Sequence, residues 1–254
     1  MMRNEQTPRL SGRLRAIVDM VSPGSVVCDV GCDHAHVPIA LLKEGRIPSA
    51  LAMDVIPGPL VKAGENLALY GEEKRVVLRL SDGLDAYRAG EAQCLIVTGM
   101  GGRIIRDILT REPEKSRDFT EMVLSPQADQ WLVRQALRDL GYCIDREALI
   151  LEDGKYYPVI HAAKGEQVRP LWPGGIGNED ALEAEDRFGP VLLRKRDPLL
   201  LVFLRWQLAI NERILSSIEG AGEGDRRRER HEAISHTVSM IRIGLLAFKE
   251  EEQS

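Results

Sequence analysis

The sequence predicts an α/β protein whose sheet has five parallel strands and a terminal antiparallel hairpin, followed by an all-α segment. Three observations predict it. Short apolar or β-branched runs alternate with helical patterns through residues 25–140. Two longer strand-like runs, residues 142–151 and 156–163, then flank a short Asp-Gly turn. Beyond residue 180 the strand patterns stop, and apolar residues recur at helical spacing.

The five predicted parallel strands are short and apolar. They cover residues 25–30, 49–55, 75–80, 94–98 and 120–125. Predicted helices cover residues 10–21, 35–44, 57–69, 130–140 and a segment from the glycine run at 99–102 to residue 109. Strict alternation of strand and helix favours parallel strands, because each crossover helix returns the chain to the same edge of the sheet.

The chain is predicted to form two domains, residues 1–165 and 166–254, because residues 164–180 are rich in glycine and proline, as linkers are. Two C-terminal helices follow, joined by Gly220–Gly224 as an antiparallel hairpin. The apolar face of the first helix holds Leu199, Val202, Phe203, Trp206, Ile210, Ile214 and Ile218, and that of the second holds Ile234, Val238, Ile241, Leu245 and Phe248. We expect Phe203 and Trp206 to form core rather than base-stacking platforms.

The bulk composition is that of an ordinary globular protein. The formal net charge of −5 excludes a global basic field, so nucleic-acid binding would depend on a local patch. No signal-peptide core and no apolar run of about 18 residues is present, which predicts a cytoplasmic protein without membrane contact. The four cysteines (Cys28, Cys32, Cys94 and Cys143) are expected to be reduced thiols. A monomer is expected, because no long exposed heptad seam is evident.

The stretch S-V-V-C-D-V-G-C-D-H-A-H-V, residues 25–37, is the predicted centre of the site. An apolar strand ends at Gly31 and a helix begins near Ala35, which is how α/β proteins present a nucleotide-like ligand. Gly31 lets the backbone approach the ligand, and free N–H groups are expected at the helix start. Cys32 and Asp33 replace the second glycine of G-x-G-x-x-G, which disfavours a dinucleotide and suits a ligand without pyrophosphate.

Acidic or glycine residues lie at the ends of four of the predicted strands in order. Asp29 can orient the loop or accept from a ligand amino group, and Asp54 can accept from both ribose hydroxyls. Asp82 with Gly83 suits the amino group of adenine, and residues 99–102 lie where the reacting groups would meet. One such aspartate more often caps a turn than binds a ligand. Four at successive strand ends favour a ligand site.

Two other clusters leave alternatives open. Cys28, Cys32, His34 and His36 could suggest a metal site, but Cys28 lies inside a strand and C-x₃-C is not a typical zinc spacing, so no metal is expected. His34 is expected to line the ligand loop. The basic residues Arg194, Lys195, Arg196, Arg226, Arg227, Arg228 and Arg230 flank the helical hairpin. They are either solvated helix ends or RNA-binding phosphate contacts.

Several motifs together resemble one family. D-V-G-C-D-H-A-H-V-P (29–38), A-M-D-V-I-P-G-P-L (52–60), R-L-S-D-G-L (79–84), V-T-G-M-G-G (97–102), E-D-G-K-Y-Y (152–157) and R-F-G-P-V-L (187–192) resemble the bacterial tRNA (adenine(22)-N(1))-methyltransferases, the TrmK type of class I S-adenosylmethionine (AdoMet) methyltransferases. The resemblance covers nearly the whole chain. It departs at Thr98, where a smaller residue is usual, and at residues 125–127, Ser-Pro-Gln in place of Gln-Pro-Asn.

The resemblance implies a Rossmann-like methyltransferase that converts AdoMet to S-adenosylhomocysteine and adenine 22 of tRNA to 1-methyladenosine. The residues that would bind the cofactor are Asp29, Gly31, Cys32, His34, Asp54, Val55, Asp82, Gly83, Thr98 and Gly99. Asp33 and the backbone carbonyls of Gly99 and Met100 are the catalytic candidates, because the product ring is cationic. The C-terminal helices would grip the tRNA.

Three alternatives compete with this interpretation. A methyltransferase for another RNA or a small molecule would keep the cofactor site and change the target. An NAD-dependent oxidoreductase could use Asp54 equally well, but the terminal hairpin replaces the further parallel unit that such a fold would show. A non-catalytic binding module would have no need of Asp29, Asp54 and Asp82 together.

Overall fold

The computed structural model describes residues 7–169, 172, 176–219 and 225–249. The chain divides into two compact units, Met1–Gln167 and Val168–Ser254, and each is described by itself.

Unit 1 is built on a seven-stranded sheet in the order β3-β2-β1-β4-β5-β7-β6. Its strands are β1 Val27–Val30, β2 Ala50–Asp54, β3 Val76–Leu80, β4 Cys94–Thr98, β5 Glu121–Ser125, β6 Tyr142–Glu152 and β7 Lys155–Lys164. The first five are parallel, and β7 lies between β5 and β6, antiparallel to both. The predicted parallel sheet with a terminal hairpin is confirmed.

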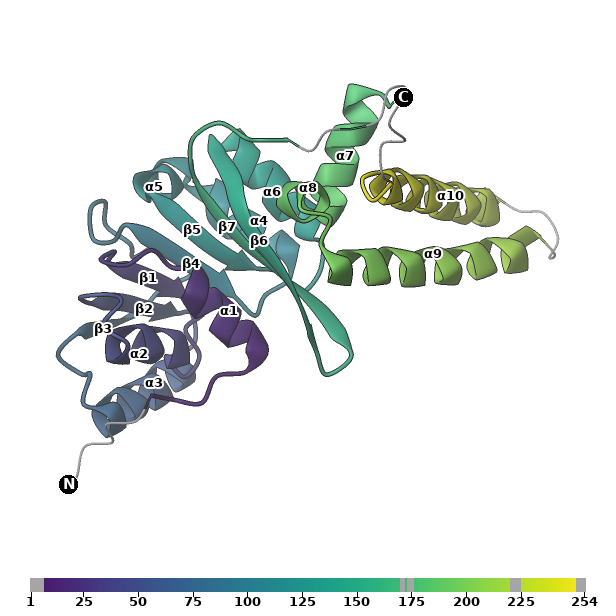
Figure 1. Cartoon of the computed structure of the whole chain (residues 1–254). Coiled ribbons are helices and arrows are strands. Elements are labelled where there is room, and N and C mark those ends of the chain that lie inside the picture. Colours follow the sequence, from purple (N-terminus) through teal and green to yellow (C-terminus); the bar gives the residue numbers. More distant parts are fainter. Residues whose placement is uncertain (1–6, 170–171, 173–175, 220–224, 250–254) are drawn as a thin grey trace. The chain divides into compact units, whose positions relative to one another are not determined.

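Helices cover both faces of this sheet (Figure 1). On one face lie α1 Gly12–Met20, α2 His36–Lys43 and α3 Pro57–Tyr70, and their apolar sides form a shared core with the strands. On the other lie α4 Gly102–Arg111, α5 Pro113–Asp118 and α6 Gln130–Asp139. The six-residue α5 was not predicted, since it is too short to show a periodic pattern.

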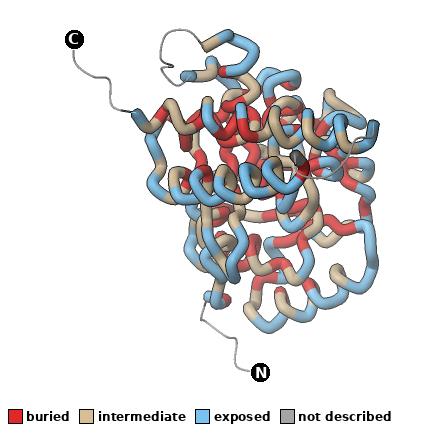
Figure 2. Tube along the Cα trace, turned by 90° about the vertical axis from the view of Figure 1, so that its right-hand side faces the viewer, coloured by how far each residue is buried: buried red, intermediate tan, exposed pale blue. Residues whose placement is uncertain are grey.

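The strands inside the sheet are more buried than the edge strand β3. Every residue of β1, β2 and β5 is buried, whereas the edge strand β3 is largely half-exposed or exposed, and Figure 2 shows the buried segments in red. Strands covered by helices on both faces favour apolar side chains, and the exceptions in these three strands are Asp29, Asp54, Glu121 and Ser125. The central strands therefore can reach a ligand only through their ends and the loops that follow them.

A buried polar cluster lies at the amino end of β5. The Glu121 carboxylate accepts hydrogen bonds from the Ser22 N–H at 3.2 Å, from the Ser22 hydroxyl at 2.6 Å and from the Ser25 hydroxyl at 3.1 Å. It also faces His161 Nε2 at 2.8 Å, while His161 Nδ1 faces the Asp145 carboxylate. Burial raises the pKa of Glu121, but the hydrogen bonds from His161 and Ser22 outweigh it and bring the pKa to about 2.

Unit 2 is helical. It consists of α7 Asn178–Phe188, α8 Pro190–Arg194, α9 Pro198–Glu219 and α10 Asp225–Leu246, with α9 and α10 packed side by side (Figure 1). The two predicted C-terminal helices are confirmed, and Gly220–Gly224 lies outside the described residues. Helix α7 begins inside the predicted linker of residues 164–180, so that prediction is wrong at its end. Its buried positions include two alanines and two acidic residues, so the helix shows a weak apolar pattern.

The core of unit 2 differs in part from the predicted one: Ile218, Val238 and Ile241 are buried as expected. Trp206 is 49% exposed and Val202 is 55% exposed, so the expectation that Trp206 is a core residue is wrong. Leu204 is buried instead, and it packs with Phe188 of α7 against Gly244 of α10, where an added Cβ would lie 2.9 Å from the Phe188 ring. The unpredicted α7 supplies Phe188, which explains why a different face of α9 is buried.

No helix in the described part of the chain is long and apolar enough to cross a membrane. All four cysteines are free thiols; Cys28, Cys32 and Cys94 are buried and Cys143 is half-buried.

Candidate functional site

The residues predicted to bind the cofactor lie at the carboxyl edge of the sheet. The strand order reverses between β1 and β4, and this switch point is where open α/β sheets bind ligands. Val30 at the end of β1 is in register with Val97 of β4 and with Met53 of β2. The loops that follow these strands therefore start side by side, as the sequence predicted.

The turn after β1 is held by contacts on both sides. Gly31 has a φ of +75°, and an added Cβ would lie 2.2 Å from Cε of Met100, so the Met100 side chain covers this glycine. The N–H groups of Gly31 and Cys32 both donate to the carbonyl of Met53, at 2.8 and 3.1 Å. The N–H groups of Gly31 and Cys32 are therefore occupied, because the turn folds back on β2.

Free donors remain one turn later. The N–H groups of His36 and Val37, at the start of α2, have no acceptor among the residues that the structure describes. Between the two sets of donors, Asp33 and Ala35 have positive φ values of 45° and 56°. Each such non-glycine residue costs about 1–2 kcal/mol, and strain of this kind collects at ligand-binding loops.

Asp33 and His34 present their side chains at this loop. The Asp33 side chain is 75% exposed, and its carboxylate lies 3.6 Å from His34 Nε2. The loop backbone is fixed from α3, because the Asn66 amide donates to the His34 carbonyl at 3.0 Å. The structure thus leaves the Asp33 carboxylate open to a ligand, as a catalytic candidate requires.

Asp29 is a buried carboxylate without a hydrogen-bond donor in the described part of the chain. Burial raises its pKa to about 7, and the negative charges of Asp54 and Asp33 add to the shift. Asp54, at the end of β2, accepts from the Ile56 N–H at 2.9 Å through Oδ1. A cationic or donor-rich ligand would supply the partners that these two carboxylates lack.

An exposed apolar surface lies beside Asp54. Val55 and Ile56 are each 58% exposed, and Leu80 at the end of the neighbouring β3 is also exposed. Side chains of this kind at a strand end suit the face of a flat ring. Val55 was among the predicted cofactor residues, whereas Ile56 and Leu80 were not.

The third acidic residue lies in the loop after β3. Asp82 is exposed, and its Oδ2 pairs with Nη1 of Arg111 at 2.8 Å. Gly83 follows with a φ of +57°, and Ile108 of α4 lies beneath it, 3.1 Å from where a Cβ would be. This loop is therefore held against α4.

The loop after β4 presents bare backbone. Nothing lies within 4 Å of a Cβ added at Gly99 or at Gly101, and Gly99 has a φ of +78°. The carbonyl of Met100, a catalytic candidate, accepts from the Gln127 N–H at 2.9 Å, so one of its two lone pairs is already occupied. Thr98 is in register with Ser125, whose buried hydroxyl has no partner among the described residues.

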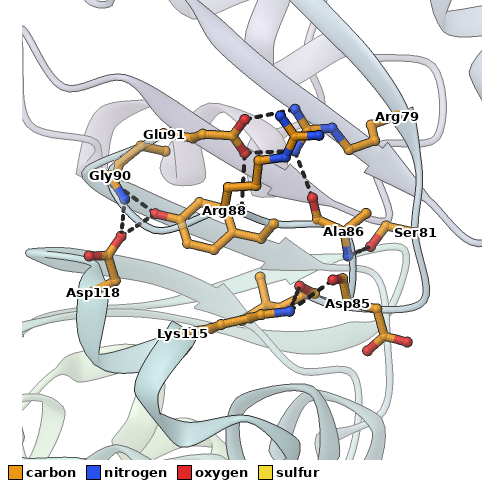
Figure 3. A network of polar contacts seen from close by, with 12 residues as sticks. Arg79, Ser81, Asp85, Ala86, Arg88, Gly90, Glu91, Lys115 and Asp118 are labelled. Carbon is orange, nitrogen blue, oxygen red and sulfur yellow. Dashed lines mark hydrogen bonds and ion pairs between the residues drawn. The ribbon is translucent and has the colours of Figure 1, made fainter.

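A network of polar contacts that the sequence did not predict holds the loop between β3 and β4 (Figure 3). Arg79 pairs with Glu91 at 2.6 and 2.8 Å and donates to the Ala86 carbonyl at 2.7 Å. The hydrogen bond to Glu91 raises the pKa of Arg79 and lowers that of Glu91. Asp118 accepts from the Tyr87 hydroxyl at 2.5 Å. No local pattern signals these pairs, because up to 31 residues separate the partners.

The two basic clusters lie at separate places in unit 2. Arg194 ends α8, and Lys195 and Arg196 follow it, just before α9. The second cluster, Arg226, Arg227, Arg228 and Arg230, begins α10. Since α9 has 22 residues, it is about 33 Å long and separates the clusters along the chain. Any nucleic-acid contact would therefore be spread over the length of this helix.

In the described part of the chain, no group of three or more His, Cys, Asp or Glu side chains is arranged to hold a metal ion.

Comparison with known proteins identifies the chain. The model of a methyltransferase domain family matches residues 10–160. The tRNA (adenine(22)-N(1))-methyltransferase of Bacillus subtilis is 26% identical over 234 residues, 92% of this chain and 96% of that protein. The crystal structure of B. subtilis TrmK matches with a TM-score of 0.81 at 25% identity, covering 93% of this chain and 99% of that one. Streptococcus pneumoniae Sp1610 in complex with S-adenosyl-L-methionine matches with a TM-score of 0.75 at 28% identity, over 93% of this chain and 100% of that one.

The match of the methyltransferase domain model includes β1 to β6, ends inside β7 and covers every strand end described above. The relatives extend the likeness through unit 2. The chain therefore belongs to the methyltransferase domain family, and within it to the TrmK type that its motifs resemble.

Proposed function

We propose that this protein transfers the methyl group of AdoMet to N1 of adenine 22 in tRNA. The observation that carries the proposal is the array of Asp29, Asp54 and Asp82 around the Gly31 turn, in a chain that matches the B. subtilis enzyme over 92% of its length. The AdoMet complex of the S. pneumoniae relative supports the choice of cofactor.

The residues of the array fit AdoMet. Asp29 is buried without a partner among the described residues, and the cationic amino group of the amino-acid part would supply one. Asp54 would accept from the ribose hydroxyls, and Val55 would pack on the adenine ring. Bound AdoMet supplies a methyl group on a positively charged sulfur. The methyl group is thus already activated by the sulfur, so the protein has mainly to position the two reactants and to exclude water.

The acceptor would approach over the bare backbone of Gly99 and Gly101. N1 of adenine is a neutral in-plane nucleophile, so no strong base is required, and orientation supplies most of the rate. The purine becomes cationic as the methyl group arrives. The exposed carboxylate of Asp33 and the carbonyl of Gly99 are the groups that would stabilise this charge.

Unit 2 would bind the tRNA backbone. Arg226, Arg228 and Arg230 are exposed on the first turns of α10, and cations of this kind bind phosphate. Arg227 belongs to the same cluster, and Arg194, Lys195 and Arg196 form a second one before α9. In a protein whose net charge is −5, these two clusters would supply the local positive charge that a tRNA ligand needs. The protein would act as a monomer in the cytoplasm, where its substrate is processed.

One observation favours a different acceptor. Thr98 and residues 125–127 depart from the family pattern and lie at the ends of β4 and β5, beside the expected target pocket. A change there would alter which nucleoside fits and leave the cofactor residues intact. A methyltransferase acting on another RNA position is therefore the second candidate.

The experiment measures transfer of label from AdoMet to an unmodified tRNA transcript and to the same transcript with guanine in place of adenine 22. The proposal predicts label in the first transcript and none in the second. Equal labelling of both transcripts would show that the methylated base lies elsewhere in the RNA.

A further inference from the structure

The loop between β3 and β4, residues 81–93, forms no helix or strand, and it carries Asp82 and Gly83. An irregular loop fixes the direction of a side chain only where other groups hold its backbone. Ser81 secures its first residues, because the Ser81 hydroxyl donates to the Gly83 carbonyl at 2.9 Å and accepts from the Ala86 N–H at 3.0 Å. The Arg79–Glu91 pair closes its far end (Figure 3).

Lys115 of α5 holds the middle of this loop. Its ammonium donates to the carbonyls of Leu84 at 3.0 Å and Asp85 at 2.8 Å (Figure 3). It also donates to the Glu112 carboxylate at 2.9 Å. These bonds use all three of its donors, and the side chain is only 21% exposed. Charged donors make stronger bonds to carbonyls than neutral ones, so Lys115 fixes the backbone two and three residues after Asp82.

Arg111, at the end of α4, holds the Asp82 side chain itself. Its Nη1 lies 2.8 Å from Oδ2 of Asp82 and 3.4 Å from Oδ1 of Asp85. Among the described residues, Oδ1 of Asp82 has no hydrogen-bond donor. The pair thus orients the carboxylate and leaves one oxygen for a ligand.

We propose that Lys115 and Arg111 are positioning residues that set the Asp82 carboxylate to accept from the exocyclic amine of the AdoMet adenine. This inference rests on the proposed function, and it adds the reason for adenine selectivity. A hypoxanthine ring carries a carbonyl oxygen in place of that amine, so a fixed carboxylate would repel it. A loosely held carboxylate could turn away and would discriminate less.

The experiment compares two ligands by calorimetry: S-adenosylhomocysteine and its deaminated analogue, S-inosylhomocysteine. We expect the wild-type protein to prefer the adenine ligand by about 10–100-fold, the cost of leaving a polar group unpaired. Lys115→Met and Arg111→Gln should each weaken the adenine ligand by about 5–20-fold and the analogue by less than about 3-fold. The ratio of the two affinities therefore falls toward one.

Three variants serve as controls. Arg106→Gln removes a similar arginine of α4 that pairs with Asp107 and does not touch the loop. Lys74→Met removes an exposed lysine just before the other end of β3. Both should keep the wild-type ratio. Lys115→Arg retains donors for the two carbonyls and should restore most of the selectivity.

The outcomes separate this inference from the proposed function. An unchanged ratio in both Lys115→Met and Arg111→Gln would overturn the positioning role. Equal binding of the two ligands by the wild type would also overturn the positioning role, although it would leave the proposal of AdoMet binding intact. If the wild type bound neither ligand, the proposed function would fall as well. Partial unfolding reduces both apparent affinities by the same factor, so the ratio still reports on the loop.

Discussion

The N–H of Gly102 donates to the carbonyl of Ala128 at 2.7 Å, and a Cβ on Gly102 would lie 2.2 Å from the carbonyl oxygen of Asp129. The first residue of α4 is thus pressed against the backbone of the loop after β5. Backbone atoms cannot rotate away as a side chain can, so this contact requires glycine. It joins the two loops that border the proposed acceptor site.

Gly102→Ala is therefore expected to lower the free energy of unfolding by about 3 kcal/mol or more, the upper range for forced overpacking. Gly101→Ala is the matched control, because Gly101 has an ordinary φ of −67° and nothing within 4 Å of an added Cβ. Urea unfolding of both variants measures the difference. Equal stabilities would show that the loop yields without cost.

Asp54→Ala should weaken S-adenosylhomocysteine binding by about 1.5–3 kcal/mol, the loss of charge-assisted hydrogen bonds. Calorimetry gives the affinity. Asp139→Ala, an exposed aspartate at the end of α6, controls for the loss of one negative charge. An affinity equal to that of the wild type would remove Asp54 from the site.

Asp29 should make both stability and binding depend on pH. Its folded-state pKa is raised from 3.8 to about 7, so the folded protein holds a proton that the unfolded chain releases. Stability therefore falls as pH rises from about 4 to 7, and Asp29→Asn should remove this fall. Binding of a cationic amino group should release the proton at pH 6. Calorimetry in two buffers of different ionisation enthalpy measures that release, and none is expected in Asp29→Asn.

The buried cluster around Glu121 should govern stability in acid. The pKa of Glu121 is lowered from 4.5 to about 2, so its contribution is complete above pH 4.5 and is lost as pH falls toward 2. The shift corresponds to roughly 3 kcal/mol. The free energy of unfolding of Glu121→Gln should be lower than that of the wild type by about this amount at neutral pH, and the two should converge near pH 2. The exposed Glu114→Gln should show no such pH-dependent difference from the wild type. A constant difference across that range would assign the loss to packing.

Neutralising Arg226, Arg227 and Arg228 to Gln should weaken tRNA binding at low salt. If they contact phosphates, the slope of log K against log salt should decrease by about 2–3. Neutralising three arginines of unit 1 (Arg88, Arg106 and Arg117) controls for net charge. An unaltered slope would show that these arginines are solvated residues of the helix surface that do not contact phosphate.

Sequence motifs predicted the sheet and the residues at the strand ends, because both features depend on local sequence. The Gly31 turn follows from an apolar run that stops at a glycine, and the hairpin follows from an Asp-Gly turn between two strand-like runs. Parallel strands place all such ends at one edge of the sheet, so the sequence alone suffices to group Asp29, Asp54 and Asp82.

What could not be predicted depends on packing between distant segments. Arg111 reaches Asp82 across 29 residues of sequence, and Lys115 lies on a helix too short to show periodicity. The occupied N–H of Gly31 depends on how tightly the turn closes over Met53. Trp206 was misplaced because α7, whose buried positions gave little apolar signal, packs with α9 against α10 through Phe188 and Leu204.

The most direct test of the central claim is nucleoside mass spectrometry with sequence mapping, after the protein has acted on unmodified tRNA with labelled AdoMet. The proposal predicts 1-methyladenosine at position 22 and a matching yield of S-adenosylhomocysteine. Label on another nucleoside or at another position would agree with AdoMet as the cofactor but would contradict adenine 22 as the target. Bound AdoMet without any labelled RNA would contradict a tRNA methyltransferase altogether.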